Sequence, residues 1–479
     1  MSALTRIGHF IGGEVTDSHD GATMPSVDPT SRAAWAEVAR GSAKDVDRAV
    51  TSAREAFDAG PWPRMTQNER SALLHRFADM LLGHADELAL LDTRDMGRPL
   101  SLTRANDVVR SAANLRFFAD DARLAADVSL PGHPGHHIYT RHEPAGVVAA
   151  VSPWNFPLMQ ATWKIAPALA YGNTVVLKPA EQSPASATRL AELAVEAGLP
   201  PGVLNVVHGT GPAGAGEALV SHEGVDLVTF TGETRTGEAV MRAAADGVRA
   251  VSFELGGKGA SIVFADADLD RAVSVAADAA FSNAGQICLA GSRLLVERSV
   301  YGRVVDLLVE KARHLRLGDP REPRTEVGPL SSQEHHAKVT GHLRRAAGEG
   351  AVLLAGQAPD GWWVAPTVVV DAPSDAAICR EEVFGPVLTV HPFDTEEEAV
   401  HAANATRYGL SAMVFTSRLA RAHRVAGQLR AGNVWVNCFW VRDLRAPFGG
   451  FGRSGIGREG GGHSREFFTE AKTVVMDVG

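Results

Sequence analysis

Apolar residues recur at helical spacing over much of the first 125 positions, after about forty residues that mix short apolar pieces with turn residues. That opening segment is expected to form short strands. Ser42 with Asp45 three residues later is a capping-box pattern, and the apolar period behind it predicts a helix up to Gly60. The same period predicts two further helices, over residues 67–96 and 102–125.

The pattern changes after residue 143, where short apolar runs alternate with helical stretches. The clearest of these helices covers residues 184–197, with Ser183 as its cap and Gly198 as its end. Strands and helices at this pitch are typical of a parallel sheet covered by helices, which binds ligands at the carboxyl ends of its strands. The predicted strands cover residues 147–151, 174–177, 203–207, 227–230 and 251–253.

A second series of strands and helices begins after residue 254 and predicts a second α/β domain. Its clearest elements are strands over residues 261–264 and 294–297 and helices over residues 269–281 and 300–315. The chain ends in EFFTEAKTVVMDV, a strand-like run with no later partner in sequence. Because an unpaired edge strand invites aggregation, we expect it to pair with residues 127–143 or with another subunit.

Composition excludes several classes of protein. A chain of 479 residues is expected to form at least two domains, and no apolar run approaches the roughly 20 residues of a membrane span. A net charge of −9 without a basic block argues against nucleic acid as a partner. The N-terminus lacks the pattern of a secretory signal, and three widely spaced cysteines do not suggest a disulfide framework. A cytoplasmic location is therefore expected.

Candidate chemistry centres on Cys288, which lies in the run FSNAGQICLAGSR between two strongly patterned segments. The reactive form of cysteine is the thiolate, so this residue needs an opening to substrate and a base. Glu254, after the fifth predicted strand, is a candidate base, and Asn155, after the first, is a candidate donor to an oxyanion. The structural alternatives are an ordinary ion pair for Glu254 and a turn residue for Asn155.

Two further segments at strand ends could hold a nucleotide. Lys178 and Glu181, after the second strand, could bind ribose hydroxyls, although they could equally be turn residues. In FTGETRTGEAV, Gly232 and Gly237 open a predicted helix and could let backbone N–H groups face a phosphate. This spacing differs from the GxGxxG fingerprint and is weak evidence alone.

Six motifs in order make the chain resemble the NAD(P)-dependent aldehyde dehydrogenase superfamily, from Ile7 nearly to the C-terminus: PWNFP, LKPAE, FTGETRTG, ELGGK, GQIC and EEVFGPV. The resemblance implies an α/β fold with a Rossmann-like NAD-binding domain, an α/β catalytic domain and a small β oligomerisation element. It implies oxidation of an aldehyde to a carboxylic acid through a thiohemiacetal and a thioester on Cys288. Glu254 is then the general base, and Asn155 with the Cys288 N–H forms the oxyanion hole.

The resemblance also implies a cofactor site. Lys178 and Glu181 would bind the adenosine ribose, and Glu382 with Phe384 the nicotinamide ribose. Because Glu181 would repel a phosphate on that adenosine ribose, NAD is expected rather than NADP. Glu233 departs from the family pattern, since it stands where a serine usually meets the pyrophosphate. The remaining expected cofactor residues are Ser152, Pro153, Trp154, Gly211, Phe230, Thr231, Gly232, Thr234, Gly237, Leu255 and Gly256.

FTGETRTG, VRDLRAPFGG and SGIGREGGGHSREFFTEAKTV resemble the branch that oxidises 2-hydroxymuconic and related muconic semialdehydes in aromatic degradation. Those substrates carry carboxylates, and by this resemblance Arg110 and Arg442 are candidates to bind one. A structural or solvated role is the alternative for both arginines. Trp163, Ile287, Leu289 and Phe448 complete the expected substrate site.

The resemblance gives the expected domain bounds: residues 1–123 and 145–255 bind NAD, 256–450 carry catalysis, and 124–144 with 460–479 form the oligomerisation element. A homodimer or homotetramer is expected. Two alternatives remain open, a dehydrogenase for a neutral aldehyde and a catalytically silent binding protein on the same fold. No metal site is expected, because the histidine spacings match no known one.

Overall fold

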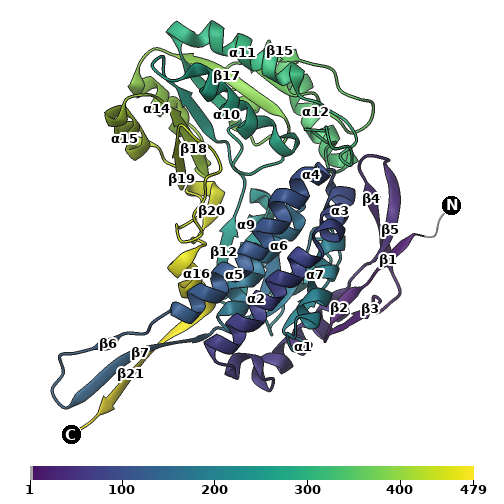
Figure 1. Cartoon of the computed structure of the whole chain (residues 1–479), viewed down its shortest axis with the longest axis vertical. Helices are drawn as coiled ribbons and strands as arrows, with labels where there is room; N and C mark the ends of the chain where they lie inside the picture. Colours follow the sequence, from purple (N-terminus) through teal and green to yellow (C-terminus); the bar gives the residue numbers. More distant parts are fainter. Residues whose placement is uncertain (1–3) are drawn as a thin grey trace.

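Two sheets of mainly parallel strands form the framework of the protein, whose computed structural model describes residues 4–479 (Figure 1). The first sheet has the strand order β20-β12-β11-β8-β9-β10-β2-β3. The strands from β12 to β10 run parallel, whereas β20, β2 and β3 join antiparallel. The bounds are β2 His9–Ile11, β3 Glu14–Thr16, β8 Val147–Val151, β9 Thr174–Lys178, β10 Leu204–Val206, β11 Leu227–Thr231, β12 Ala250–Glu254 and β20 Gly455–Ile456.

The second sheet has the order β15-β16-β17-β14-β13-β18-β19, and only β15 pairs antiparallel to its neighbour. Its bounds are β13 Ala260–Val263, β14 Arg293–Glu297, β15 Val352–Ala355, β16 Thr367–Val370, β17 Val387–Phe393, β18 Ser411–Phe415 and β19 Asn433–Val436. A separate three-stranded sheet near the N-terminus contains β1 Thr5–Ile7, β5 Ala33–Ala39 and β4 Thr23–Asp28.

Helices cover both faces of each large sheet because successive side chains of a strand point to opposite sides. In β8, Val148 and Ala150 belong to the core under α2, α5, α6 and α7, whereas Val147 and Ala149 belong to the core under α1, α8 and α9. The first group of helices is α1 Ala43–Asp58, α2 Gln67–Gly83, α3 Ala85–Met96, α4 Leu100–Leu102, α5 Val109–Leu124, α6 Pro157–Ala170, α7 Ala185–Glu196, α8 Ala215–Ser221 and α9 Thr234–Ala245. The second is α10 Leu269–Phe281, α11 Tyr301–His314, α12 Gln333–Gly348, α13 Ala377–Arg380, α14 Glu396–Asn404, α15 Leu419–Gln428 and α16 Gly461–Phe468.

The bounds predicted for α1, α7, α10 and α11 hold to within two residues, whereas the two helices expected over residues 67–96 and 102–125 differ in detail. The capping box of α1 is confirmed, since the Ser42 N–H donates to the Asp45 carboxylate at 2.9 Å. The helix expected over residues 67–96 is two helices that meet at His84, and a π-helical turn over Thr103–Val108 precedes α5. Ser183 does not cap α7: Pro184 holds that position, and the Ser183 hydroxyl is buried without a partner among the described residues.

The C-terminal strand pairs with the segment near residue 140, which is one of the two arrangements expected. β21 Thr469–Asp477 runs antiparallel to β7 His136–Pro144, which also pairs with β6 Ser129–Leu130. Figure 1 shows this ribbon projecting from the body of the protein with the C-terminus at its tip. In residues 4–479, no helix is long and apolar enough to cross a membrane.

The strand order fixes where a ligand can enter the first sheet. The chain passes from β8 through β9 to β10, then returns to the other side of β8 to form β11 and β12. A crevice opens at such a switch point, outside the carboxyl ends of the two strands that flank it. Asn155 follows β8 and Gly232 follows β11, so both residues lie at that crevice.

Candidate active site

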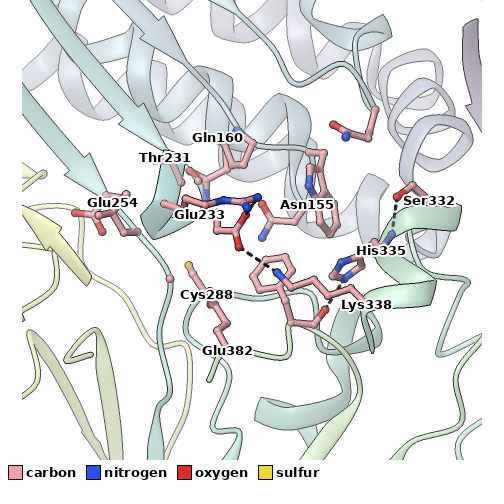
Figure 2. A pocket seen from close by; sticks show the side chains of 18 of the residues that line it. Asn155, Gln160, Thr231, Glu233, Glu254, Cys288, Ser332, His335, Lys338 and Glu382 are labelled. Atoms are coloured by element: carbon pink, nitrogen blue, oxygen red, sulfur yellow. Dashed lines mark hydrogen bonds and ion pairs between the residues drawn. The ribbon is translucent and has the colours of Figure 1, made fainter. Parts of the chain in front are cut away.

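A cleft of about 720 Å³ lies between the carboxyl ends of the first sheet and elements of the second (Figure 2). It brings together the three predicted catalytic residues, Cys288, Glu254 and Asn155. Eight predicted cofactor residues also line it: Pro153, Trp154, Thr231, Gly232, Leu255, Gly256, Glu382 and Phe384. The other seven lie outside its lining: Ser152, Lys178, Glu181, Gly211, Phe230, Thr234 and Gly237.

The loop that carries Cys288 is fixed to the end of β8. The Asn155 side chain donates to the Gln286 carbonyl at 2.9 Å, and the Asn283 side chain donates back to the Asn155 carbonyl at 3.0 Å. Gly285 has a φ of +70°, and a Cβ there would lie 2.0 Å from the Gly385 carbonyl oxygen. The loop is therefore held by both large sheets. One N–H of the Asn155 amide is committed to the loop, which leaves the other for a ligand.

The resting state of Cys288 is the thiol. Burial raises its pKa to about 12, and the negative charges of Glu254 and Glu382 act in the same direction. The charge of Arg442 and the backbone N–H of Leu289 act the other way. A thiol in this environment needs a proton acceptor before it can attack a carbonyl carbon.

Glu254, the last residue of β12, is such an acceptor. It is 5% exposed, and neither carboxylate oxygen accepts a hydrogen bond from the described residues. Burial, followed by the charge of Glu459, raises its pKa to about 8, while Lys164 and Arg442 oppose the rise. A carboxyl group that titrates near neutral pH suits general acid–base chemistry.

Glu459 belongs to a buried polar group behind Glu254. It pairs with the Lys164 ammonium at 2.5 Å and accepts a hydrogen bond from the indole N–H of Trp163. Lys164 is fully buried, so its charge is compensated only because this carboxylate meets it. Trp163 is thereby held by its nitrogen, and its ring is oriented by the same contact.

The nucleotide candidates on β9 lie beside the first sheet. The Lys178 ammonium is buried, donates to the Pro179 carbonyl at 2.8 Å and lies 3.7 Å from the Glu181 carboxylate. A Cβ on Gly216 would approach Lys178 Cδ at 3.3 Å and Gly211 Cα at 2.9 Å. The absence of a side chain at Gly216 therefore lets the Gly211 loop and Lys178 approach each other closely.

On the opposite wall, Glu382 reaches the loop after β12. The Gly257 N–H donates to its carboxylate at 2.9 Å, and a Cβ on Gly256 would lie 1.9 Å from its other oxygen. Burial raises the pKa of Glu382 to about 7. Beside it, the Phe384 ring packs edge-on against Trp154 with ring centroids 5.3 Å apart. Trp154 thus belongs to this wall of the cleft, as a predicted cofactor residue.

Gly232 and Gly237 do not present their own N–H groups to the cleft. The Gly232 N–H donates to the Glu254 carbonyl, and the Gly237 N–H donates to the Glu233 carbonyl within α9. Both positions need glycine for packing, since a Cβ would lie 2.5 Å from the Phe230 ring or 2.6 Å from a Leu255 methyl group. Anion binding at α9 would therefore use the N–H groups of its first turn.

The two arginines expected in the substrate site lie near each other without acidic partners. Arg442 is clamped between the rings of Trp163 and Phe448, with its guanidinium carbon 4.1 and 3.8 Å from the ring centroids. Its Nε and one Nη are buried without a hydrogen-bond partner among the described residues. Burial and the charge of Arg110 lower its pKa to about 10, and burial also lowers the pKa of Arg110. Ile287 and Leu289, also expected to contact substrate, are buried in the same core cluster as Phe448, against which Cys288 packs.

Residues of α12 line the cleft although no motif predicted them, and one of them contacts Glu233. His335 contacts the Phe384 carbonyl at 2.7 Å and packs against Trp154, and Lys338 pairs with Glu233 at 3.2 Å. Gln160, one turn after Asn155, also lines the cleft. No sequence signal marks α12, because its place at the cleft depends on packing between the two sheets.

The family model that describes the aldehyde dehydrogenase family matches residues 15–474. The chain is 47% identical to a 2-hydroxymuconic semialdehyde dehydrogenase of Pseudomonas sp. strain CF600, over 99% of this chain and all of the relative. It is 42% identical to a 2-aminomuconic 6-semialdehyde dehydrogenase of Pseudomonas sp., with 98% of each covered. The NAD+ complex of an aldehyde dehydrogenase from Bacillus cereus superposes with a TM-score of 0.97 at 42% identity, covering 99% of this chain and 97% of that one. The chain therefore belongs to the aldehyde dehydrogenase family, which confirms the fold class and the enzyme class predicted from its motifs.

Proposed function

We propose that this enzyme oxidises a carboxylated semialdehyde of the muconic type to a dicarboxylic acid, with NAD as the hydride acceptor. The observation that carries the substrate class is the guanidinium of Arg442, which lies near Arg110 and has two buried nitrogens without a hydrogen-bond partner among the described residues. A buried, unpaired charge costs several kcal/mol, and a substrate carboxylate would offset that cost. The relatives named for hydroxymuconic and aminomuconic semialdehydes support the same class.

The residues of the cleft fit a dinucleotide. Glycine at Gly256 leaves room where a side chain would collide with Glu382, and the Thr231 hydroxyl at the cleft is buried without a hydrogen-bond partner in residues 4–479. Lys178 and Glu181 would hold the adenosine ribose, and Glu382 with Phe384 the nicotinamide ribose. NAD, when bound, accepts the hydride that leaves the substrate carbon. Glu181 disfavours a phosphate on the adenosine ribose, so NAD is preferred over NADP.

Catalysis then uses three groups of this chain. Cys288 loses its proton to Glu254 and adds to the aldehyde carbon, and the free N–H of Asn155 with the Cys288 N–H stabilises the oxyanion. Loss of hydride from that carbon leaves a thioester on Cys288. Glu254 releases that first proton to solvent and then removes a proton from water, which attacks the thioester. Collapse of the adduct releases the carboxylic acid and a thiolate, and Glu254 returns its proton to the Cys288 sulfur.

The test is a pair of arginine variants assayed on two substrates. Arg442→Met keeps an unbranched side chain between Trp163 and Phe448 but removes the charge. With 2-hydroxymuconic semialdehyde its kcat/KM should fall by about 10- to 150-fold, the worth of hydrogen bonds to a charged group. With hexanal it should fall only about threefold, through the weaker stabilisation of the Cys288 thiolate. Arg445→Ala is the control, because Arg445 is exposed and pairs with Asp443 at 2.6 Å. Equal losses on both substrates would contradict the carboxylate clamp.

We further propose the domain functions that the motifs predict. Residues 1–123 and 145–255 bind NAD, residues 256–450 carry the nucleophile, and residues 124–144 with 460–479 join copies of the chain into a homodimer or homotetramer. The projecting ribbon of β7 and β21 supports the last assignment, because β21 is an edge strand with exposed Val475 and Met476. Three free cysteines support a cytoplasmic location.

A further inference from the structure

An ion pair crosses the cleft between the two large sheets. Glu233 is the N-cap residue of α9 in the first sheet's layer, and Lys338 lies on α12 beside the second sheet. The Glu233 carboxylate lies 3.2 Å from the Lys338 ammonium and 3.7 Å from the guanidinium of Arg235 (Figure 2). Both Glu233 and Lys338 line the cleft.

This pair is not part of the structural framework of α9. Glu233 makes no side-chain cap hydrogen bond, although N-cap residues commonly use their side chains to bind the first turn. Its side chain and that of Lys338 are 47% and 41% exposed, so the pair lies in solvent that a ligand would displace. An exposed pair of this kind is worth at most about 1 kcal/mol to the free protein. Its main effect should therefore appear when a charged ligand enters.

The position of the ion pair determines which ligand it affects. The first turn of α9 offers N–H groups and a partial positive charge, which favour a phosphate. The Glu233 carboxylate stands at that turn and carries the same sign of charge as a phosphate. It also holds Lys338, the cation of α12 that could otherwise reach an anion in the cleft. A pyrophosphate at α9 therefore meets repulsion from Glu233 and competes with it for Lys338.

We propose that Glu233 is a cofactor-affinity residue, which weakens the binding and speeds the release of the dinucleotide by opposing its pyrophosphate and by holding Lys338. This inference rests on the proposed function, because it needs a dinucleotide in the cleft. A serine at this position would lack both effects. In many enzymes the release of product limits turnover. A carboxylate beside the pyrophosphate would speed that release.

The experiment compares the dissociation constants of NADH in wild type, Glu233→Gln and Glu238→Gln, by fluorescence titration at low salt. Glutamine keeps the size of Glu233 and removes its charge. Glu238 is the matched control, since it lies one turn later on α9, pairs with Arg453 at 3.1 Å and does not line the cleft. Glu233→Gln should bind NADH about three- to tenfold more tightly, and Glu238→Gln should bind it like wild type.

Two further arms identify the cause. ADP-ribose, which carries the pyrophosphate, should show the same gain in Glu233→Gln, whereas adenosine should show none. Raising the ionic strength to about 0.5 M should shrink the gain, because exposed charges are screened. In a Lys338→Met background the gain should be smaller than in wild type, since one of its two sources is gone.

Unchanged or weaker NADH binding by Glu233→Gln would overturn the inference, as would an equal gain for adenosine. Failure of wild type to bind NADH at all would instead overturn the proposed function. The two failures are therefore distinguishable in the same titration.

Discussion

Replacing Glu254 by glutamine should abolish the complete reaction and yet stabilise the protein at alkaline pH. The pKa of Glu254 rises from 4.5 to about 8 in the folded state, chiefly through burial. The folded state therefore holds this proton between pH 4.5 and 8 while the unfolded chain releases it, so the contribution of Glu254 to stability falls as pH rises through that window. Each unit of pKa corresponds to about 1.4 kcal/mol, so above pH 8 the ionised Glu254 lowers the free energy of unfolding by about 5 kcal/mol. At pH 5 this reduction is only about 1 kcal/mol.

Glutamine keeps the shape of the protonated acid and never ionises, so it escapes this cost. Thermal unfolding of wild type and Glu254→Gln at pH 5, 7 and 9, at one protein concentration, should show a gap in melting temperature that widens with pH in favour of the variant. Other buried carboxyl groups are common to both proteins and cancel in the comparison. Glu238→Gln, at a position whose side chain is partly exposed and paired with Arg453, should show no widening gap.

The same variant tests the role of the residue. Without its base, the enzyme should lose most of its steady-state turnover, by about 10²- to 10⁴-fold, because neither the thiol nor water is activated. A gap that is constant across pH, or a variant that melts lower at pH 9, would refute the account of Glu254 as a buried, unpartnered acid. Near-normal turnover would refute its role as base.

Three other outcomes follow from the structure. Burial lowers the pKa of His208 to about 3, so the unfolded chain binds this proton more readily and the stability of the protein falls as pH drops below about 6.5. His208→Gln should therefore lose less melting temperature than wild type between pH 7 and 5, and an equal loss would contradict this account. Gly256→Ala should weaken NADH binding by about tenfold, because its Cβ displaces Glu382. Gly302→Ala is the control and should bind NADH like wild type, since no atom lies within 4 Å of the added Cβ. Equal affinities of the two variants would exclude the steric argument. Arg442→Met should slow alkylation of Cys288 by iodoacetamide at pH 9 by about threefold or more, since it removes a charge that favours the thiolate, and Arg445→Ala should leave the rate unchanged.

The apolar period predicted most elements of the fold but not their local ends. The limits of α10 and the capping box of α1 follow from contacts within a few residues of each other, which sequence spacing records directly. The break at His84 has no proline to mark it, and the apolar face continues on both sides of it. Ser183 failed as a cap because Pro184 takes the N-cap position and α7 begins one residue later.

The site was predictable where it depends on strand ends. Parallel strands end at one edge of a sheet, so Asn155 after β8 and Glu254 at the end of β12 were expected to lie together with Cys288, and one cleft does hold all three. The pairs that tune the site join distant parts of the chain. Lys164 and Glu459 are 295 positions apart, and Glu233 and Lys338 are 105 apart. No local pattern records such contacts, because they arise only when segments distant in sequence pack together.

The presence of two arginines, where one would bind a carboxylate, follows from the charges of the proposed reaction. The reaction places two negative charges near Arg442: the substrate carboxylate at one end, and the sulfur or the oxyanion at the other. Arg442 already lowers the pKa of both Glu254 and Cys288, so a carboxylate that neutralised it alone would make the thiolate harder to form. Arg110 supplies a second positive charge next to it, at the cost of mutual repulsion while the site is empty. The substrate carboxylate relieves that repulsion and leaves one positive charge for the nucleophile. A neutral aldehyde leaves the repulsion between the two arginines in place, so the same pair disfavours it relative to a carboxylated one.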